Sequence, residues 1–514
     1  MKTYHFLKNL FVLMVAFMTT TALAACGGDD DNGAGGGTPV AGLTVKPQTL
    51  SFSADGGTLT ISAQAPQKAE ATSSADWCQV TVGDQQGDLR VTPITVVAAA
   101  NPTTYERTAV VTITAGSLSA TVMVTQAEGT ADIQPGNITK TAMQIAREMY
   151  PGWNLGNTME AGSNANNWTN NGGTGAETAW QQTRTTQAII DYVRSQGFRS
   201  VRIPTAWVMG HITDAGQATI DPAWMARVKE VVDYCVSAGL YVLLNDHWDG
   251  GWLENSFGDT SEATIAANSE KLAMLWTQIA HTFAHYDEHV IFGGLNEPSV
   301  DNERQTEALL KYEQAFINAV RATGGNNGRR TLVVQGPSTD VEKTSKWYDI
   351  TRLSDPAGSG YLMAEVHYYT PPQFTGVWEN NQPVWFWGAA NHVSGDSHNA
   401  SWGEEQTVQQ MFQLMKSQFA DQGYPVILGE YGANWRKLSA NQDKHDASIR
   451  LYHKTVCQRA VECGMVPMVW DVNVANQNGE AGIMTVINRA NTSVYCSFAM
   501  DGITEGVAAA QWPY

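Results

Sequence analysis

Two stretches of the chain decide the fold: Ile291-Phe-Gly-Gly-Leu-Asn-Glu-Pro298 and Pro425-Val-Ile-Leu-Gly-Glu-Tyr-Gly432. Each is a run of apolar and glycine residues that leads into a glutamate. Apolar runs bounded by Gly and Pro are typical of strands that are buried on both faces of a parallel sheet. The C-terminal tips of such strands are where closed barrels carry their functional groups. Glu297 and Glu430 therefore predict a pair of carboxylates that face one substrate.

The same pattern of strand and helix recurs from residue 150 onward. Amphipathic segments lie between most of the candidate strands, and this alternation predicts a parallel sheet in the α/β class. Eight strands predict a closed (β/α)8 barrel, a TIM barrel. The alternative is an open doubly wound sheet, which the lack of a Gly-x-Gly-x-x-Gly turn after the first strand disfavours. The candidate strands are residues 152–157, 200–207, 240–247, 290–298, 331–336, 362–370, 425–432 and 466–473.

The composition excludes some classes of partner. The 514 residues carry a formal net charge of −19, and a protein this acidic repels nucleic acid, whose binding depends on neutralised phosphates. The six cysteines show no spacing typical of a metal site, and the acidic loop over residues 249–259 lacks the ligand spacing of a calcium loop. We therefore expect no metal, no cofactor and no nucleic acid, and we expect a monomer.

The first 25 residues have the pattern of a secretory signal peptide. Lys2 and Lys8 are followed by an apolar stretch that is too short for a stable membrane span. The leader ends in Leu23-Ala-Ala-Cys26, which resembles a bacterial lipobox and implies cleavage before Cys26 and a lipid on its sulfur. Ordinary cleavage beside an unmodified cysteine is the alternative. A disordered Gly- and Asp-rich tether is predicted over residues 26–39. The resemblance implies an outer-membrane lipoprotein on the cell surface of a Gram-negative bacterium, held to the membrane only by this lipid.

Residues 40–127 differ in character, because Val, Thr, Ser and Gly dominate and apolar and polar residues alternate in short runs. Such alternation between closely spaced turns predicts a small all-β, immunoglobulin-like sandwich. Ser74-Ala-Asp-Trp77 and Val124-Thr-Gln126 resemble segments of a BACON domain, a family named for a suspected carbohydrate-binding role. We favour a spacer, because the stretch holds one tryptophan and no row of aromatic residues. A linker over residues 128–137 leads to the barrel at residues 138–514.

Polar and aromatic residues gather at the ends of the candidate strands. In a closed barrel these ends share one face, so their side chains can converge over the barrel axis. A carboxylate buried there costs free energy unless it is paired, which makes Glu297 and Glu430 hard to explain as structural residues. Each of the others, taken alone, is equally well explained by a structural role. The set is Asn157, Arg202, His247, Asn296, Glu297, His367, Tyr369, Glu430 and Trp470.

In their order along the chain, these segments resemble glycoside hydrolase family five over about residues 138–514. The resemblance implies a (β/α) barrel and a retaining hydrolase that cuts β-linked glucans or mannans within the chain. One departure is visible: many members have two adjacent histidines after the third strand, whereas here only His247 matches and Trp248 takes the other place. The motifs that carry the resemblance are Gly152-Trp-Asn-Leu-Gly-Asn157, Val201-Arg-Ile-Pro204, Asn296-Glu-Pro298, His367-Tyr-Tyr369, Gly429-Glu-Tyr431 and Trp470.

The resemblance implies a role for each matching residue. Glu297 would be the general acid/base and Glu430 the nucleophile. Arg202 and Tyr369 would contact Glu430 and lower its pKa, while the negative charge of Glu430 would raise the pKa of Glu297. A cis peptide bond is expected after Trp470. The remaining roles are a hydrogen bond from Asn296 to the sugar 2-hydroxyl, lining of the reaction site by His247 and His367, and a platform beneath the sugar ring formed by Trp470.

Aromatic residues on two long loops suggest an open groove for a sugar chain. Trp248 and Trp252 follow the third candidate strand, and residues 371–402 carry Trp378 and three further tryptophans. We expect some of these rings, together with Asn157, to bind substrate and the others to hold the loops in place. The sequence thus predicts an endo-β-1,4-glucanase that acts on cellulose-like, mixed-linkage or xyloglucan chains. The alternatives are a β-mannanase and a non-catalytic surface glycan-binding protein, and the presence of both glutamates argues against the second.

Overall fold

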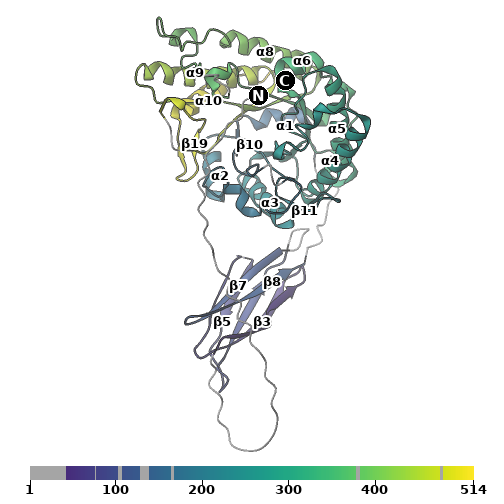
Figure 1. The fold of residues 1–514 in the computed structure, drawn as a ribbon, viewed down its shortest axis with the longest axis vertical. Coiled ribbons are helices and arrows are strands. Elements are labelled where there is room, and N and C mark those ends of the chain that lie inside the picture. Colours follow the sequence, from purple (N-terminus) through teal and green to yellow (C-terminus); the bar gives the residue numbers. More distant parts are fainter. Residues whose placement is uncertain are drawn as a thin grey trace, which may run out of the picture. The chain divides into compact units, whose positions relative to one another are not determined.

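The computed structural model describes residues 42–75, 77–101, 107–127, 138–163, 167–377, 382–474 and 479–514. The chain divides into two compact units, Met1–Thr130 and Ala131–Tyr514 (Figure 1). Four features predicted from the sequence lie outside the described residues: the signal peptide, the tether that begins at Cys26, the linker over residues 128–137, and Trp378. Among the described helices, none is both long and apolar enough to cross a membrane.

The first unit contains the predicted all-β sandwich. Two four-stranded sheets have the orders β1-β3-β6-β5 and β2-β8-β7-β4. Their core is built from alternate residues, so Ile61, Val96 and Val111 are fully buried while their neighbours along the strands are more exposed. The strands are β1 (Thr44–Lys46), β2 (Thr49–Phe52), β3 (Gly57–Gln64), β4 (Glu70–Ser73), β5 (Cys78–Val82), β6 (Val91–Ala98), β7 (Arg107–Ala115) and β8 (Leu118–Gln126).

The single tryptophan of the sandwich is held by a neighbouring arginine. The guanidinium carbon of Arg107 lies 4.4 Å from the ring centroid of Trp77. Arg107 also donates from Nε to Gln126 Oε1 at 2.9 Å and from Nη2 to the carbonyl of Ala99 at 2.8 Å. One face of the indole is therefore covered by a side chain that has its own partners. This packing favours the spacer interpretation, which stays a prediction.

The second unit contains the predicted closed barrel of eight parallel strands. All eight strand predictions are confirmed, and the open-sheet alternative is wrong, because β18 pairs with β9 and closes the sheet. The strands are β9 (Gly152–Asn154), β10 (Ser200–Ile203), β13 (Tyr241–Asn245), β14 (Val290–Gly293), β15 (Leu332–Asp340), β16 (Leu362–Tyr368), β17 (Val426–Tyr431) and β18 (Met465–Val469).

Several strands end earlier than their apolar patterns predict. β10 ends at Ile203, although the apolar pattern continues to Trp207. Beyond the strand, the backbone amides of Trp207, Val208 and Met209 donate to the carboxylate of Asp249 at 2.7 to 2.8 Å. Because Asp249 supplies these hydrogen bonds, the chain leaves the barrel ladder and forms a loop at its C-terminal rim.

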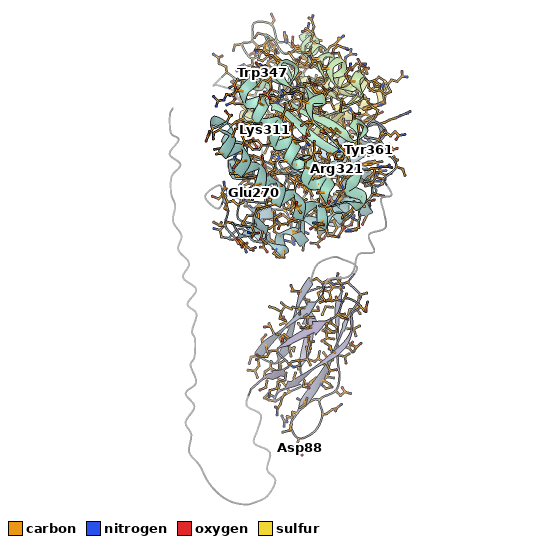
Figure 2. All side chains as sticks on the ribbon, turned by 90° about the vertical axis from the view of Figure 1, so that its right-hand side faces the viewer. Asp88, Glu270, Lys311, Arg321, Trp347 and Tyr361 are labelled. Atoms are coloured by element: carbon orange, nitrogen blue, oxygen red, sulfur yellow. The ribbon has the colours of Figure 1, made fainter. Side chains whose placement is uncertain are left out.

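Helices surround the barrel (Figure 1). Glu270 on α4 and Lys311 on α5 are exposed, and both lie in this outer layer (Figure 2). α4 and α5 are joined by an ion pair of 2.7 Å between Lys311 and Glu262. The helices of this unit are α1 (Ala142–Met149), α2 (Gln187–Ser195), α3 (Pro222–Ser237), α4 (Glu262–Thr282), α5 (Glu303–Ala322), α6 (Val341–Trp347), α7 (Pro372–Thr375), α8 (Glu405–Gln418), α9 (Gln442–Glu462) and α10 (Ser497–Ala509).

A buried histidine makes the stability of the barrel sensitive to acid. The ring of His211 stacks on Trp224 of α3 at 3.9 Å, and neither of its ring nitrogens has a hydrogen-bond partner among the described residues. Burial lowers the pKa of His211 to about 3, from an ordinary value of 6.5. As the pH falls below 6.5, the unfolded chain therefore binds the proton first, and folding stability decreases by about 1.4 kcal/mol per pH unit.

We expect His211→Phe, which keeps a flat ring against Trp224 and cannot be protonated, to be less sensitive to acid than the wild type. The measurement is the melting temperature of both proteins at about pH 7 and about pH 4.5, where the wild type should lose more. An equal loss in the two proteins would show that His211 does not titrate on unfolding.

Candidate active site

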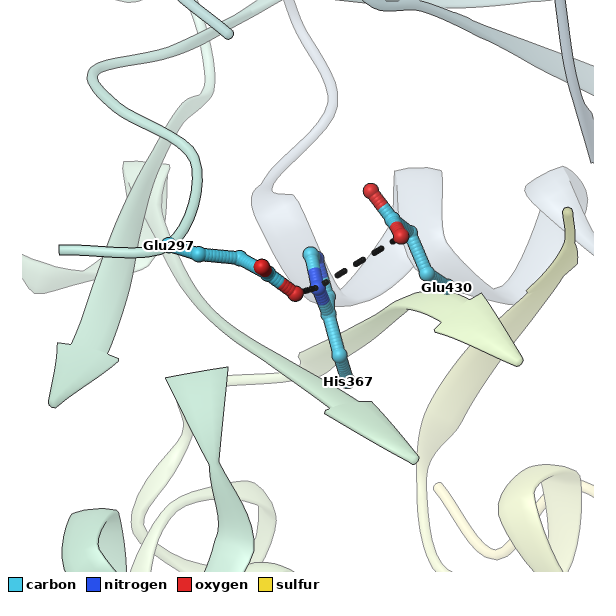
Figure 3. Close-up of side chains that lie close together, drawn as sticks. All are labelled: Glu297, His367 and Glu430. Carbon is cyan, nitrogen blue, oxygen red and sulfur yellow. Dashed lines mark hydrogen bonds and ion pairs between the residues drawn. The ribbon is translucent and has the colours of Figure 1, made fainter. Parts of the chain in front are cut away.

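Glu297 and Glu430 meet at the C-terminal rim of the barrel (Figure 3). Glu297 lies on the loop after β14, and its side chain is 43% exposed. Glu430 lies within β17, and its side chain is 8% exposed. One carboxylate oxygen of each glutamate and one ring nitrogen of His367 lie within 4.8 Å of one another. The structure therefore brings both predicted carboxylates to one place, with His367 between them.

Arg202 links Glu430 to Asn296, the residue before Glu297. It is fully buried in β10 and donates from Nη1 to Glu430 Oε1 at 2.9 Å. From Nη2 it donates to Asn296 Oδ1 at 2.8 Å, which fixes the residue beside Glu297. Its Nε lies 3.0 Å from Glu365 Oε1, and its Nη1 also reaches Asn154 Oδ1 at 3.1 Å. The predicted contact with Glu430 is present, and the guanidinium also holds three further residues.

Glu365 and Asn154 were missed by the sequence analysis. Glu365 is fully buried in β16, and its carboxylate accepts from Gln335 Nε2 at 2.6 Å. A glutamate inside the apolar run of residues 362–368, two positions before His367 and so on the same face of the strand, was the signal that could have revealed it. Asn154 donates from Nδ2 to the carbonyl of Gly429 at 2.9 Å and links β9 to β17.

A glycine allows these carboxylates to pack together. A Cβ atom on Gly429 would lie 2.0 Å from Glu365 Oε1 and 3.0 Å from His367 Nε2. Because Arg202 and Gln335 hold the Glu365 carboxylate in place, a larger residue at position 429 would displace the group that pairs with Arg202. The glycine before Glu430 is thus required by close approach rather than by backbone conformation.

The protonation pattern differs from the prediction. His367 Nδ1 lies 2.7 Å from Glu297 Oε1 and 3.8 Å from Glu430 Oε2. Burial opposes a charge on His367, but Glu430, Glu297 and Glu365 outweigh it and raise its pKa to about 10. Burial also opposes ionisation of Glu297, yet the hydrogen bond and charge of His367 hold the pKa of Glu297 below its ordinary value.

Burial raises the pKa of Glu430, although the charges of His367 and Arg202 and the hydrogen bond from Tyr369 act in the opposite direction. The predicted order, with Glu430 lowered and Glu297 raised, is therefore wrong for this state of the protein. The physical reason is His367, whose protonated ring bonds directly to Glu297 and not to Glu430.

Trp470 lines the site, and the ring of His247 lies beside it. Their rings are nearly parallel, at 7° and 5.9 Å between centroids. The peptide bond after Trp470 is trans, so the expected cis bond is wrong. The trans form is the lower in energy by about 3 kcal/mol, and the indole still reaches the site from it. The Asp471 carboxylate accepts the indole N–H of Trp153 at 3.0 Å, which anchors the chain just after Trp470.

The remaining predicted residues are Tyr369, Asn157, Trp248 and Trp252. Tyr369 donates its hydroxyl to Glu430 Oε2 at 3.0 Å, as expected. Asn157 adopts a left-handed backbone conformation with φ 57°, and its amide donates to Glu160. Trp248 and Trp252 line a cavity of about 10 Å³ beside Asn296 and do not line the two grooves described below. Substrate contacts of Asn157, Trp248 and Trp252 stay predictions.

A further acid, the half-buried Glu254, lines the same small cavity and was not predicted. Its side chain adjoins Asn296 and the backbone amide of Glu297. Burial and the negative charge of Glu297 raise the pKa of Glu254 to about 8, so it is protonated at neutral pH. A neutral Glu254 supports Asn296 and the Glu297 loop without adding a negative charge to the site.

Two grooves meet at the paired carboxylates. The β18 lobe, of about 470 Å³, is lined by Glu430, Trp470 and residues that follow β17 and β18. The α8 lobe, of about 580 Å³, is lined by His367, Trp402 and residues of β15, α6 and α8. Glu297 and Tyr369 line both lobes, so the two form one open cleft across the barrel rim. A chain molecule could lie along this cleft with its middle at Glu297.

The three described tryptophans of the loop after β16 differ in their surroundings. Trp387 is fully buried, and Trp385 stacks on His398 at 3.5 Å, so both rings hold the loop in place. Trp402 is 52% exposed and faces the α8 lobe.

The donor set of Glu297, His367 and Glu430 meets one geometric requirement of a metal site. Their ligand atoms are close enough to surround one ion. The bond of 2.7 Å between His367 and Glu297 and the raised pKa of His367, about 10, favour a shared proton between these groups. The arrangement suits the storage and transfer of a proton between His367 and the two carboxylates.

Comparisons with known proteins agree with this geometry. A family model described as cellulase (glycosyl hydrolase family 5) matches residues 160–476. A model of the BACON family, described as a putative N-terminal binding domain, matches residues 67–127. Endoglucanase A of Paenibacillus barcinonensis is 32% identical over 384 residues, which cover 71% of this chain and 90% of that protein. The xyloglucan-specific endo-beta-1,4-glucanase BoGH5A of Bacteroides ovatus is 32% identical over 446 residues, which cover 82% and 84%.

Solved structures show the same likeness. The chain is similar to XEG5B, a xyloglucan-specific beta-1,4-glucanase of this family from a ruminal metagenomic library, solved in complex with XXLG. The TM-score is 0.68 and the identity 47%, over 73% of this chain and 98% of that one. It is also similar to the Bacteroides ovatus xyloglucanase in complex with a XXXG heptasaccharide. There the TM-score is 0.65 and the identity 29%, over 91% and 100% of the two chains.

Proposed function

Because the chain belongs to glycoside hydrolase family 5, we propose that it is a retaining endo-β-1,4-glucanase with xyloglucan as its preferred substrate. The observation that carries the proposal is the pair of carboxylates on one open cleft. Both glutamates are present and positioned, which argues against a non-catalytic glycan-binding protein. An open cleft fits a polymer that is cut within its length rather than from its end.

The spacing of the carboxylates supports retention of configuration. Retaining glycosidases hold the two carboxyl groups about 5–5.5 Å apart, whereas inverting enzymes leave about 6.5–9.5 Å for a water molecule between them. One oxygen of Glu297 and one of Glu430 lie within 4.8 Å of each other, which fits the shorter of these separations. Glu430 can therefore attack the anomeric carbon itself.

The reaction follows in two displacements. In the first, a Glu430 oxygen bonds to the anomeric carbon, the bond from that carbon to the glycosidic oxygen breaks, and Glu297 gives its proton to the leaving oxygen. In the second, water attacks the same carbon, gives a proton to Glu297 and releases Glu430. Arg202 and Tyr369 hold Glu430 for the attack, at 2.9 and 3.0 Å from its two oxygens.

His367 supplies the proton that Glu297 needs. The neighbouring carboxylates raise the pKa of His367 to about 10, which favours a proton on the ring before substrate binds, and Glu297 is its hydrogen-bond partner. Movement of the proton across this bond of 2.7 Å turns an ion pair into a neutral pair. A substrate that excludes water favours the neutral pair, because separated charges are costly in a medium of low dielectric constant. Substrate binding thereby favours the protonated form of Glu297, which is the form that acts as the acid.

The substrate class comes from the relatives. The solved structure at 47% identity and the curated relative aligned with 82% of this chain both carry xyloglucan-specific names. Xyloglucan has a β-1,4-glucan backbone with side branches, and an open cleft leaves space for such branches. Cellulose-like and mixed-linkage glucans share the backbone and should be cut less rapidly. A β-mannanase is the less favoured reading, since no relative described above is named for mannan.

We further propose that the mature protein is a lipoprotein of the outer membrane, anchored at the cell surface through Cys26, with the sandwich as a spacer. The support is the sequence Leu23-Ala-Ala-Cys26 at the end of an apolar leader.

The first prediction concerns the two carboxylates. Glu430→Gln and Glu297→Gln should each lower kcat on soluble xyloglucan by roughly a thousandfold, with melting temperatures near that of the wild type, because each removes one proton-transfer or bonding group. Glu307→Gln is the matched control, since Glu307 is an exposed glutamate paired with Arg352 on the barrel surface. Wild-type activity in Glu430→Gln would contradict the assignment. Proton NMR of the first product should show the β anomer, whereas an α anomer would overturn retention.

The second prediction concerns the substrate. The purified protein is incubated with xyloglucan, barley mixed-linkage glucan, carboxymethylcellulose and glucomannan, and the release of reducing ends is measured. We expect the highest rate on xyloglucan and an early fall in viscosity, which is typical of cuts within the chain. A higher rate on glucomannan would favour the mannanase alternative. Gel retardation without release would favour a binding protein.

The third prediction concerns the anchor. When the full chain is expressed in a Gram-negative host, we expect the protein in the membrane fraction and Cys26→Ala in the soluble fraction, because the acyl chains are the proposed attachment. Labelling with radioactive palmitate should mark only the wild type. An unlabelled wild type would show ordinary cleavage of the leader.

A further inference from the structure

Arg489 is a buried arginine that the reaction described above does not use. It follows the short strand β19 (Ile487–Asn488) in the segment after β18, and its side chain is 1% exposed. Its guanidinium carbon lies 4.7 Å from the ring centroid of Trp153, which is fully buried in β9. A cation in such a place is costly unless it is hydrogen-bonded. The hydrogen bonds of Arg489 therefore show what the residue holds in place.

These bonds link the loop after β9 to the loop after β18. From Nη1, Arg489 donates to the carbonyl of Gly156 at 2.9 Å and to the hydroxyl of Thr158 at 2.8 Å. From Nη2, it donates to the carbonyl of Asp471 at 2.7 Å and to one oxygen of its carboxylate at 3.3 Å. Asp471 is the residue after Trp470, so the guanidinium fixes the backbone beside the ring that lines the cleft.

The two loops approach each other closely at Trp470. A Cβ atom on Gly156 would lie 2.6 Å from the carbonyl oxygen of Asp471 and 3.0 Å from the indole ring of Trp470. The same carbonyl oxygen accepts from Arg489. Because the loops touch at this point, a shift of one relative to the other would move the indole ring.

The carboxylate of Asp471 has anchors that do not depend on Arg489. It accepts from the backbone amides of Ile487 at 2.8 Å and Asn473 at 2.9 Å, and from the indole N–H of Trp153 at 3.0 Å. Within the part of the chain that the structure describes, the carbonyl of Asp471 accepts a hydrogen bond from Arg489 alone. Loss of the guanidinium would therefore release this carbonyl while the carboxylate stays anchored.

We propose that Arg489 is a positioning residue, which holds the ring of Trp470 where the sugar bonded to Glu430 requires it. The inference rests on the proposed function and adds to it a residue that does not line the β18 lobe. Glu430 and Trp470 line that lobe together, so a sugar bonded to Glu430 lies against this wall.

The effect of Arg489 should appear in the chemical step. In a retaining glycosidase, the sugar at the reacting carbon is distorted toward a half-chair or boat as the bond breaks. A ring fixed for the distorted sugar contacts the transition state better than the ground state, and only such contacts accelerate the reaction. Displacement of Trp470 should therefore lower kcat more than it raises KM.

Arg330 provides a matched control. It is also fully buried, and its guanidinium carbon lies 5.0 Å from the ring centroid of Phe292. Like Arg489, it donates to backbone carbonyls, those of Phe283 at 3.0 Å and Tyr286 at 2.7 Å. Arg330 precedes β15 and so lies at the N-terminal end of the strands, away from the rim that carries the cleft.

The first measurement is steady-state kinetics on soluble xyloglucan. Arg489→Lys keeps the charge, but its single nitrogen cannot bind both loops as the guanidinium does. We expect kcat to fall about tenfold and KM to stay within about threefold of the wild type. Arg330→Lys should lower the melting temperature by a similar amount and keep kcat within about twofold. Gly156→Ala, which leaves every buried charge in place, should lower kcat in the same way as Arg489→Lys.

A double-mutant cycle tests whether Arg489 acts through Trp470. Trp470→Phe alone should lower kcat, because the smaller ring leaves part of the wall empty. In that background, Arg489→Lys should lower kcat by less than about twofold, since residues that act together have effects that do not add. If Arg489→Lys does not fold, Gly156→Ala takes its place in the cycle.

An unchanged kcat in Arg489→Lys and Gly156→Ala would overturn the inference. So would an equal fall of kcat in Arg330→Lys, which would show a general effect of lost packing, or additive losses in the cycle, which would exclude action through Trp470. These outcomes differ from failure of the proposed function, in which the wild type itself releases no reducing ends from any β-glucan.

Discussion

The charge of Arg202 is the constraint on which the rest of the site depends. A guanidinium that is fully buried must be paired and fully hydrogen-bonded, because removal of an ion from water costs far more than a neutral group does. Its partners come from four other strands or their ends: Asn154, Asn296, Glu365 and Glu430. The hydrogen bonds that satisfy Arg202 thus fix both Glu430, the predicted nucleophile, and Asn296, the neighbour of the predicted acid. The catalytic geometry and the barrel interior are therefore maintained by the same bonds.

Much of the architecture could be predicted from the sequence because it follows from local patterns. Apolar runs of strand length that alternate with amphipathic segments gave all eight barrel strands. Period-two alternation gave the sandwich. The strand ends were less well predicted, because tertiary contacts decide where a strand ends: the amides after β10 turn to Asp249, which is distant in sequence. No pattern within residues 200–207 reveals that partner.

The candidate site, too, could be predicted only in part from the sequence. Glu297, Glu430, Arg202 and Tyr369 were predicted because motifs mark them, and the structure brings them together. The pKa order of the two glutamates was predicted wrongly, because it depends on which carboxylate the ring of His367 approaches, at 2.7 Å rather than 3.8 Å. Differences of that size are set by packing in three dimensions. Glu254 was missed for a related reason, since its raised pKa results from burial beside Glu297, which the loop sequence does not show.

Gly429 has a consequence for attempts to alter this protein. Exposed side chains at the barrel rim, such as Trp402, can be exchanged to suit different polymers. Position 429 has no such freedom, because a single added carbon would lie 2.0 Å from a carboxylate oxygen that is already committed to Arg202. Libraries that aim to change the substrate selectivity should therefore vary the loops and keep glycine at position 429. In this strand, the smallest residue is the one that tolerates no substitution.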